Sequence, residues 1–276
     1  MSLQEKDDGL RLLAEILPAI SAQLRGSLGN LHLAFSRIAT PEQRALDAEL
    51  DRNAAILQQS YFRLLRLAGN LTCASRLMSS VPLPLQNLDV TALAESVYHE
   101  CRPLAEQTGH TLVFHNAPAP IVVALHRESV QRVLLHLLSN ALKFSSAGSE
   151  VTLHCRRSAT QVLLTVQDHG AGIPGEKLAQ LMDTPLSQYV PASLPHGLGL
   201  GLPLSRALAE GMGGRLLLES APTGTSVTLA LPLRLTAAVA QDVPFQYTGG
   251  FSAALTELSD ALPFQAFLLG QSPQER

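Results

Sequence analysis

The chain has 276 residues, of which 46% are hydrophobic and 16% charged, and its formal net charge is -3. This composition is typical of a globular protein rather than a disordered one, and the weak negative charge argues against a nucleic-acid partner or an anionic membrane surface. The first residues are acidic and polar, unlike a signal peptide, and no apolar run reaches the ~18 residues that a membrane span needs. We therefore expect a cytoplasmic protein with no membrane span in this chain.

Residues 1–80 are expected to form a helical hairpin. Apolar residues recur at steps of three and four from Leu13 to Ile38, and a second run of this kind extends from Leu50 to Met78. Thr40-Pro41-Glu42 interrupts the pattern, which predicts a short turn between two long antiparallel helices. Each apolar seam is wider than one partner helix can cover. We therefore expect a homodimer in which two hairpins form a four-helix bundle; the alternative is a hairpin that packs on its own downstream domain.

The pattern changes after Ser79 to Pro84, SSVPLP, which predicts a linker. Helices are expected at 91–107 and 128–144, and strands at 111–115, 121–125, 150–157, 161–167, 214–220 and 225–232. This order predicts a sheet covered by helices rather than a doubly wound βαβ series. The fold class is thus α+β, and the expected domains are residues 1–80, residues 86–233 and a C-terminal extension at residues 234–276.

The first of three segments that could carry chemistry is LLHLLSNALKFSSAG, residues 134–148. His136, Asn140 and Lys143 lie at positions i, i+4 and i+7, so they share one face of the expected helix. An imidazole, an amide and an ammonium group on one face suit a site for a hydrated divalent cation and phosphates. The alternative is an ordinary solvated stripe.

The second segment is VQDHGAGIP, residues 166–174. Asp168 ends a strand, and Gly170 and Gly172 follow it, so a ligand ring could lie directly against the backbone. A carboxylate that accepts from an exocyclic amine would select adenine over guanine. The alternative is a plain turn in which the aspartate is the hydrogen-bonding residue.

The third segment is HGLGLGLPLSRALAEGMGG, residues 196–214, with Gly197, Gly199 and Gly201 just before a helix expected from Pro203. Free backbone N–H groups and the positive end of the helix could receive phosphate there. The glycines do not follow a strand and no Gly-Lys-Ser/Thr is present, which excludes a Rossmann fingerprint and a Walker loop. A glycine-rich hinge without a ligand is the alternative.

Together, in this order, the three segments resemble the N box and the two glycine boxes of the ATP-binding domain of bacterial sensor histidine kinases. That domain belongs to the GHKL superfamily, with gyrase, the Hsp90 chaperones and the mismatch-repair ATPases. The resemblance continues through TGTSVTLALP, residues 223–232, and the hairpin looks like the dimerisation and phosphotransfer domain, so roughly residues 10 to 233 are covered. It implies an α/β sandwich of the GHKL/Bergerat type with ATP and Mg²⁺ as cofactors.

The resemblance also implies a role for each matching residue. Asn140 would be the Mg²⁺ ligand, Lys143 a phosphate contact and Asp168 the adenine selector. The remaining ATP-binding positions would be Gly170 and Gly172 at the floor of the base pocket, Gly197, Gly199 and Gly201 at the phosphate side and the hinge of the ATP lid, and Thr225 in the closing glycine-threonine pair. His136 stands where the family usually has asparagine.

The stretch SAQLRGSL, Ser21 to Leu28, is similar to the phosphoacceptor motif of the family, which reads approximately S-H-E-L-R-T-P-L. Ala22 occupies the position of the acceptor histidine, Gln23 that of the acidic base, and Gly26 that of the residue that positions water. Phosphorylation needs an imidazole nucleophile and a carboxylate that orients it, and neither Ala22 nor Gln23 supplies these groups. His32 lies roughly 15 Å further along the helix and is followed by Leu33 rather than an acid, so it is a weak substitute.

The sequence thus favours a degenerate histidine kinase that binds ATP and Mg²⁺, does not phosphorylate itself on the usual residue, and binds a partner histidine kinase or response regulator as its output. The alternative is an active kinase that phosphorylates a histidine in trans, His32, or a serine of a partner. A chaperone or DNA-remodelling ATPase is disfavoured because the chain lacks large transducer domains.

The C-terminal extension has no counterpart in the resemblance. It predicts an amphipathic helix from Ser252 to Leu262, which we expect to pack on the ATP-binding domain. The alternative is a partner-binding segment with Phe251, Phe264 and Phe267 as apolar anchors.

Overall fold

The computed structural model describes residues 3–79, 82–175, 184, 199–237 and 251–270. The chain divides into two compact units. Unit 1 comprises residues 1–80 and 246–276, and unit 2 comprises residues 81–245. No helix in the described part of the chain is both long enough and apolar enough to cross a membrane.

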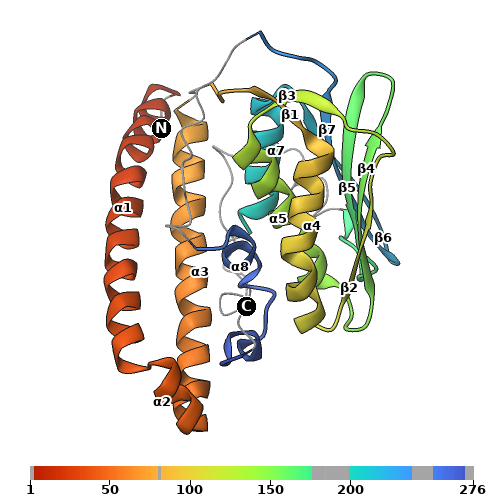
Figure 1. Ribbon diagram of the computed structural model, residues 1–276. Helices are drawn as coiled ribbons and strands as arrows, with labels where there is room; N and C mark the ends of the chain where they lie inside the picture. Colours follow the sequence, from red (N-terminus) through yellow and green to blue (C-terminus); the bar gives the residue numbers. More distant parts are fainter. Residues whose placement is uncertain (1–2, 80–81, 176–183, 185–198, 238–250, 271–276) are drawn as a thin grey trace. The chain divides into compact units, whose positions relative to one another are not determined.

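Unit 1 is built on a helical hairpin of α1 (Leu3–Ile38) and α3 (Ala48–Met78) (Figure 1). The connection contains one further helical turn, α2 (Pro41–Leu46), which begins with a capping box between Thr40 and Gln43. The Asp47 side chain then accepts hydrogen bonds from the first N–H groups of α3. The predicted turn therefore contains the N-termini of two helices, α2 and α3, and each is capped by a side chain.

The apolar residues of α1 divide into two sets. Leu28 is buried, and the Arg25 guanidinium donates a 2.5 Å hydrogen bond to Thr72 Oγ1 of α3. A second set is exposed within the single chain, and we call it the hairpin stripe: Ile20, Leu24, Leu31 and Ile38 of α1 with Leu57 and Leu64 of α3. The seam is thus wider than one partner helix covers, as the sequence predicts.

The C-terminal segment packs on the hairpin within unit 1. It contains α8 (Ala253–Leu258) and the 3-10 helix η2 (Phe264–Phe267), and both lie against α3 (Figure 1). The expectation that this segment packs on the ATP-binding domain is therefore wrong, and its helix ends at Leu258 instead of Leu262. The reason lies in long-range pairing with α3: Arg66 forms ion pairs with Glu257 and Asp260, and Phe62 contacts Phe251 and Phe267.

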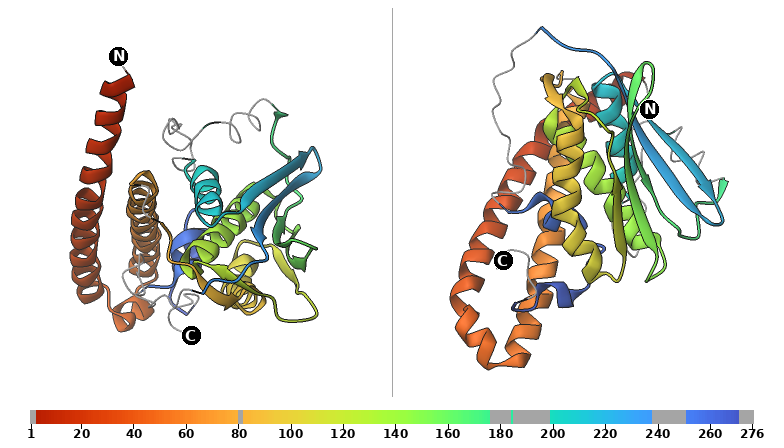
Figure 2. Two further views of the ribbon diagram at one scale, coloured as in Figure 1. Left: turned by 90° about the horizontal axis from the view of Figure 1, so that it is seen from above. Right: turned by 45° about the vertical axis from the view of Figure 1, so that its right-hand side comes forward.

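Unit 2 is a mixed α/β layer, as predicted. Its main sheet has the order β2-β4-β5-β7-β6, and only β2 and β4 are parallel. The strands are β2 (Thr111–His115), β4 (Glu150–Arg157), β5 (Gln161–Gln167), β7 (Gly224–Pro232) and β6 (Arg215–Ala221). The helices α4 (Val90–Gln107), α5 (Arg127–Phe144) and α7 (Gly201–Gly211) cover one face of this sheet (Figures 1 and 2).

Strand alternation explains which face is covered. The apolar residues Val151, Leu153 and Cys155 occupy every second position of β4 and are fully buried, and β5 repeats this spacing with the buried residues Val162, Leu164 and Val166. A small second sheet pairs β1 (Gln86–Asp89) with β3 (Val122–Leu125), and the sequence did not predict β1. Asp89 then caps α4 by accepting from the N–H groups of Thr91 and Ala92.

Candidate functional site

Asp168 lies directly after β5, where backbone groups hold its carboxylate. Its Oδ1 accepts from the N–H of Gly170 at 2.8 Å and from the N–H of Thr225 at 3.2 Å. The Asp168 N–H in turn donates to the Thr225 carbonyl at 2.9 Å. Oδ2 accepts no hydrogen bond from the residues that the structure describes. The carboxylate is therefore fixed in orientation and retains one oxygen for a ligand donor.

The two glycines of this loop lie where the backbone leaves no space for a side chain. A Cβ at Gly170 would lie 2.5 Å from the Phe144 carbonyl oxygen at the end of α5. Gly172 has φ +72°, and a Cβ there would collide with the Ala221 carbonyl of β6. The loop is therefore pressed between the end of α5 and the β6–β7 turn. This close contact brings Asp168 next to the helix that carries the first predicted segment.

Ser220 is a residue of this region that the sequence analysis missed. Its Oγ accepts from the Ile173 N–H at 2.7 Å and lies 3.1 Å from Thr225 Oγ1. This pair ties the glycine loop to both strands of the β6–β7 hairpin. A single serine in a strand carries no sequence signal for such a role.

Two of the three predicted residues of α5, His136 and Asn140, lie beside the start of α7. His136 is fully buried, and its Nδ1 is 3.2 Å from Ser205 Oγ of α7. A Cβ at Gly201 would lie 3.8 Å from His136 Cγ and 3.9 Å from Asn140 Nδ2. Asn140 and Lys143 are half-buried, and the Lys143 ammonium lies 5.4 Å from the centre of the Phe144 ring. The structure thus brings His136, Asn140 and Gly201 together.

The N-terminus of α7 is placed to interact with an anion. The residue before the helix, Leu200, makes no side-chain capping hydrogen bond. The first N–H groups of an uncapped helix carry partial positive charge and suit phosphate. Gly199 has φ +66°, which favours glycine, whereas Gly197 lies outside the described residues.

The donor set fits a Mg²⁺ ion that is held mainly by phosphates and water. The described residues contain no cluster of three or more His, Cys, Asp or Glu side chains that could hold a metal ion by themselves. Asn140 offers one half-buried amide near the start of α7. Mg²⁺ in nucleotide sites commonly takes one or two protein oxygens and completes its shell with phosphate oxygens and water.

The stretch that resembles the acceptor motif lies on α1, where Ala22, Gln23 and Gly26 are all exposed. A Cβ at Gly26 would meet no atom within 4 Å, so this surface is open in the single chain. His32, the one histidine in residues 1–80, is held between two rings. Its ring stacks on Tyr61 at 4.9 Å and meets the edge of Phe251 at 4.9 Å, and burial lowers the pKa of its imidazole.

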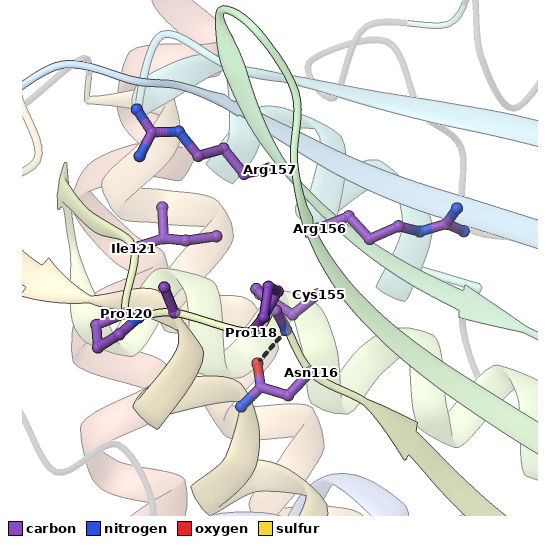
Figure 3. Close-up of a pocket in the computed structure, with 9 residues that line it drawn as sticks. Asn116, Pro118, Pro120, Ile121, Cys155, Arg156 and Arg157 are labelled. Atoms are coloured by element: carbon purple, nitrogen blue, oxygen red, sulfur yellow. Dashed lines mark hydrogen bonds between the residues drawn. The ribbon is translucent and has the colours of Figure 1, made fainter.

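A cavity of about 340 Å³ lies elsewhere in unit 2, between the loop of residues 116–121 and residues 155–157 (Figure 3). It is at the opposite end of the sheet from Asp168, because Thr152 of β4 pairs with Gln167 and Arg157 pairs with Val162. Burial raises the pKa of the Cys155 thiol to about 11, so this thiol is protonated at neutral pH. The cavity contains none of the predicted site residues.

Comparison with known proteins identifies the class. Residues 126–235 match the family of histidine kinase-, DNA gyrase B- and HSP90-like ATPases. This range contains every predicted nucleotide-side residue, from His136 to Thr225. The chain therefore carries a GHKL-type ATP-binding domain and resembles sensor histidine kinases over most of its length, which confirms the predicted fold class.

Several curated relatives support this assignment. The chain is 29% identical to the alginate biosynthesis sensor protein KinB of Pseudomonas aeruginosa, over 81% of this chain and 37% of that protein. It is 34% identical to the sensor protein kinase CarS of the same species, over 76% of this chain and 46% of that protein. The virulence sensor protein BvgS of Bordetella bronchiseptica is 32% identical, over 81% of this chain and 18% of that protein. The chain thus spans less than half the length of each of these relatives.

Among solved structures, the chain resembles full-length ShkA in complex with AMPPNP. The TM-score is 0.61 at 24% identity, over 81% of this chain and 47% of that one. This likeness confirms the fold.

Proposed function

We propose that this chain is a regulatory pseudokinase of two-component signalling, which binds ATP with Mg²⁺ and does not phosphorylate itself. One observation carries the proposal. The residues expected to bind ATP, Asp168 and Asn140, lie in a well-packed region, whereas the residue at the acceptor position of the same chain is the exposed alanine Ala22. The ATPase family match over residues 126–235 supports the nucleotide part.

In the proposed complex, Asp168 Oδ2 accepts from the exocyclic amine of adenine. Gly170 and Gly172 have no side chains, so the adenine ring can lie directly against their backbone. Lys143 and the N-terminus of α7 bind the phosphates. Asn140 contributes an oxygen to Mg²⁺, which neutralises phosphate charge when it is bound. His136 is fully buried and pairs with Ser205, which favours a role in holding α5 against α7 instead of direct metal contact.

Loss of self-phosphorylation follows from the side chains on α1. A methyl group at Ala22 has no lone pair to attack the γ-phosphate, and the neutral amide of Gln23 cannot act as a carboxylate base. Gly26 carries no side chain that could position water. His32 is packed between Tyr61 and Phe251, which supports a structural role for this imidazole.

The proposed output is binding to a partner histidine kinase or a response regulator, from a homodimer that forms through the hairpin stripe. The stripe supports dimerisation because its leucines and isoleucines are between 41% and 70% exposed in the single chain. The curated relatives are sensor kinases, which supports two-component signalling as the context.

The Asp168→Asn substitution tests the nucleotide part. We expect about 100-fold weaker binding of a fluorescent ATP analogue, because the amide cannot replace the charged acceptor at Oδ2. Glu95→Gln on the exposed surface of α4 is the matched control and should bind like the unmodified chain. Unchanged affinity in Asp168→Asn would remove Asp168 as the base selector.

The second candidate function is phosphoryl transfer in trans, from ATP bound to this chain to a residue of a partner protein. Transfer from ATP requires mainly positioning and charge stabilisation, which Asn140, Lys143 and the glycine segments could supply. Mixing the chain with candidate partner proteins and labelled ATP separates the two, since only this candidate predicts label on the partner.

A further inference from the structure

The C-terminal segment, residues 251–270, covers one side of the hairpin with two aromatic anchors. The Phe251 ring lies 5.6 Å from the Phe62 ring and 4.9 Å from His32, so it contacts both α3 and α1. The Phe267 ring also stacks on Phe62, with the ring centres 5.8 Å apart. Leu255, Leu258 and Leu262 are fully buried between the anchors.

Opposite charges line the same contact. Arg66 pairs with Glu257 at 3.0 Å and with Asp260 at 2.5 Å, and Arg63 lies 3.6 Å from Asp260. In these pairs both arginines belong to the hairpin and both acids to the segment. We call this surface, formed by Arg44, Phe62, Arg63 and Arg66, the arginine face.

The arginine face and its neighbours also bind the main chain of the segment. Arg63 donates to the Ser259 carbonyl at the end of α8, and Gln59 donates to the Leu262 carbonyl at 2.6 Å. Arg44 donates to the Phe267 carbonyl at the end of η2 at 2.8 Å. Since any peptide has carbonyl groups, these bonds fix a path for the chain, while the anchors and acids select the sequence.

The segment depends on this contact for its order. Its helices have only six and four residues, far below the ~12–15 residues at which an isolated helix is marginally stable. The Glu257 side chain is fully buried, and a buried ion pair contributes more to the choice of partner than to net stability, because desolvation offsets much of its attraction. These are the properties of a docked peptide.

The segment also leaves the hairpin stripe open. On α3 the covered positions include 59, 62 and 66, whereas Leu57 and Leu64 of the stripe lie roughly 160° around the helix. A second hairpin and the C-terminal segment could therefore occupy α3 at the same time.

We propose that the arginine face is a binding site for a short amphipathic helix that carries aromatic anchors and two acidic residues. In the isolated chain the site is occupied by residues 251–270, and a partner protein with a helix of the same chemistry competes for it. The proposal goes beyond nucleotide binding and does not depend on it.

The test uses the full chain with a protease site inserted within residues 238–250, which leaves the arginine face unchanged. The probe is a fluorescent synthetic peptide of residues 249–270. A tethered segment acts at about millimolar effective concentration, so the uncut chain should bind the probe at least ~100-fold more weakly than the cut chain after gel filtration. Circular dichroism of the cut chain checks that the hairpin retains its helices.

Charge reversal supplies the specificity control. The chain variant Arg66→Glu should lose the probe, and a probe with Glu257→Lys and Asp260→Lys should bind this variant better than it binds the unmodified cut chain. A probe with Phe251→Ala and Phe267→Ala should not bind. Three outcomes would overturn the proposal, because each would show that the segment is an integral part of the fold. They are equal probe affinity before and after the cut, a segment that never exchanges with the probe, and loss of the hairpin helices on cutting.

Discussion

At the scale of single residues, the glycines around Asp168 show how closely the loop is packed. Gly172 has φ +72° and lies against the Ala221 carbonyl. Gly148 has φ +83°, and a Cβ added there would meet no atom within 4 Å. Both glycines adopt left-handed backbone, so they differ only in the space available to a side chain.

Gly172→Ala should therefore destabilise unit 2 more than Gly148→Ala. The left-handed backbone alone costs an alanine about 1–2 kcal/mol, and the collision at Gly172 adds to it. Thermal unfolding followed by circular dichroism measures the difference, and we expect Gly172→Ala to lower Tm by at least about 4 °C more than the control. Equal losses in the two variants would mean that the loop does not pack as described.

His32 gives unit 1 a pH dependence. Burial lowers the pKa of its imidazole below 6.5, so the folded chain binds this proton less readily than the unfolded chain. The contribution of His32 to the free energy of unfolding is therefore fully present above pH 6.5 and is lost as the pH falls through its folded pKa.

The substitution His32→Gln should remove that part of the pH dependence. Denaturant unfolding at about pH 7.5 and about pH 5.5 measures it: the unmodified chain should lose more stability between the two values than the variant does. Identical losses would show that the ring contacts with Tyr61 and Phe251 do not disfavour the charged imidazole.

Some residue contacts were beyond sequence reasoning. The spacing of His136, Asn140 and Lys143 predicted one helix face, and the structure has all three on α5. The partners Ser205 and Ser220 are single serines in α7 and β6, which form their hydrogen bonds only after distant elements pack. No local pattern encodes such a pair.

At the scale of elements, periodicity predicted both long helices and most strands, because amphipathic spacing is a local signal. It failed for β1, a four-residue strand beside a proline-rich stretch, and for the location of α8. The partners of α8 are more than 190 positions away in sequence, as in the bond between Arg66 and Glu257. The sequence does not indicate which acidic residue will pair with which arginine when the two are so far apart along the chain.

At the scale of elements, the exposed hairpin stripe leads us to predict a dimer that charged substitutions in the stripe disrupt. The double variant Leu24→Glu, Leu64→Glu should convert a dimer into a monomer, because two charges on each hairpin would have to be buried without partners. Light scattering coupled to gel filtration should give twice the mass of one chain before the change and the mass of one chain after it. Leu46→Glu on α2, where the leucine is 89% exposed, is the matched control and should remain dimeric. A double variant of unchanged mass would place any dimer contact elsewhere.

At the scale of the whole molecule, the proposed function combines an ATP-binding domain with a helix that carries Ala22 and Gln23 where the family has the acceptor histidine and its acidic base. The two features belong to different units, so one can be retained while the other loses its chemistry. Nucleotide would then act as a ligand that biases the populations of conformations rather than as a substrate.

The most direct test of this account is to incubate the full chain with Mg²⁺ and γ-labelled ATP and to quantify acid-labile label on the protein, with ATP binding measured on the same sample. The account predicts bound ATP and no acid-labile label, since Ala22 and Gln23 replace the nucleophile and the base. Stable incorporation of acid-labile label would contradict it and would show that the chain phosphorylates one of its own histidines.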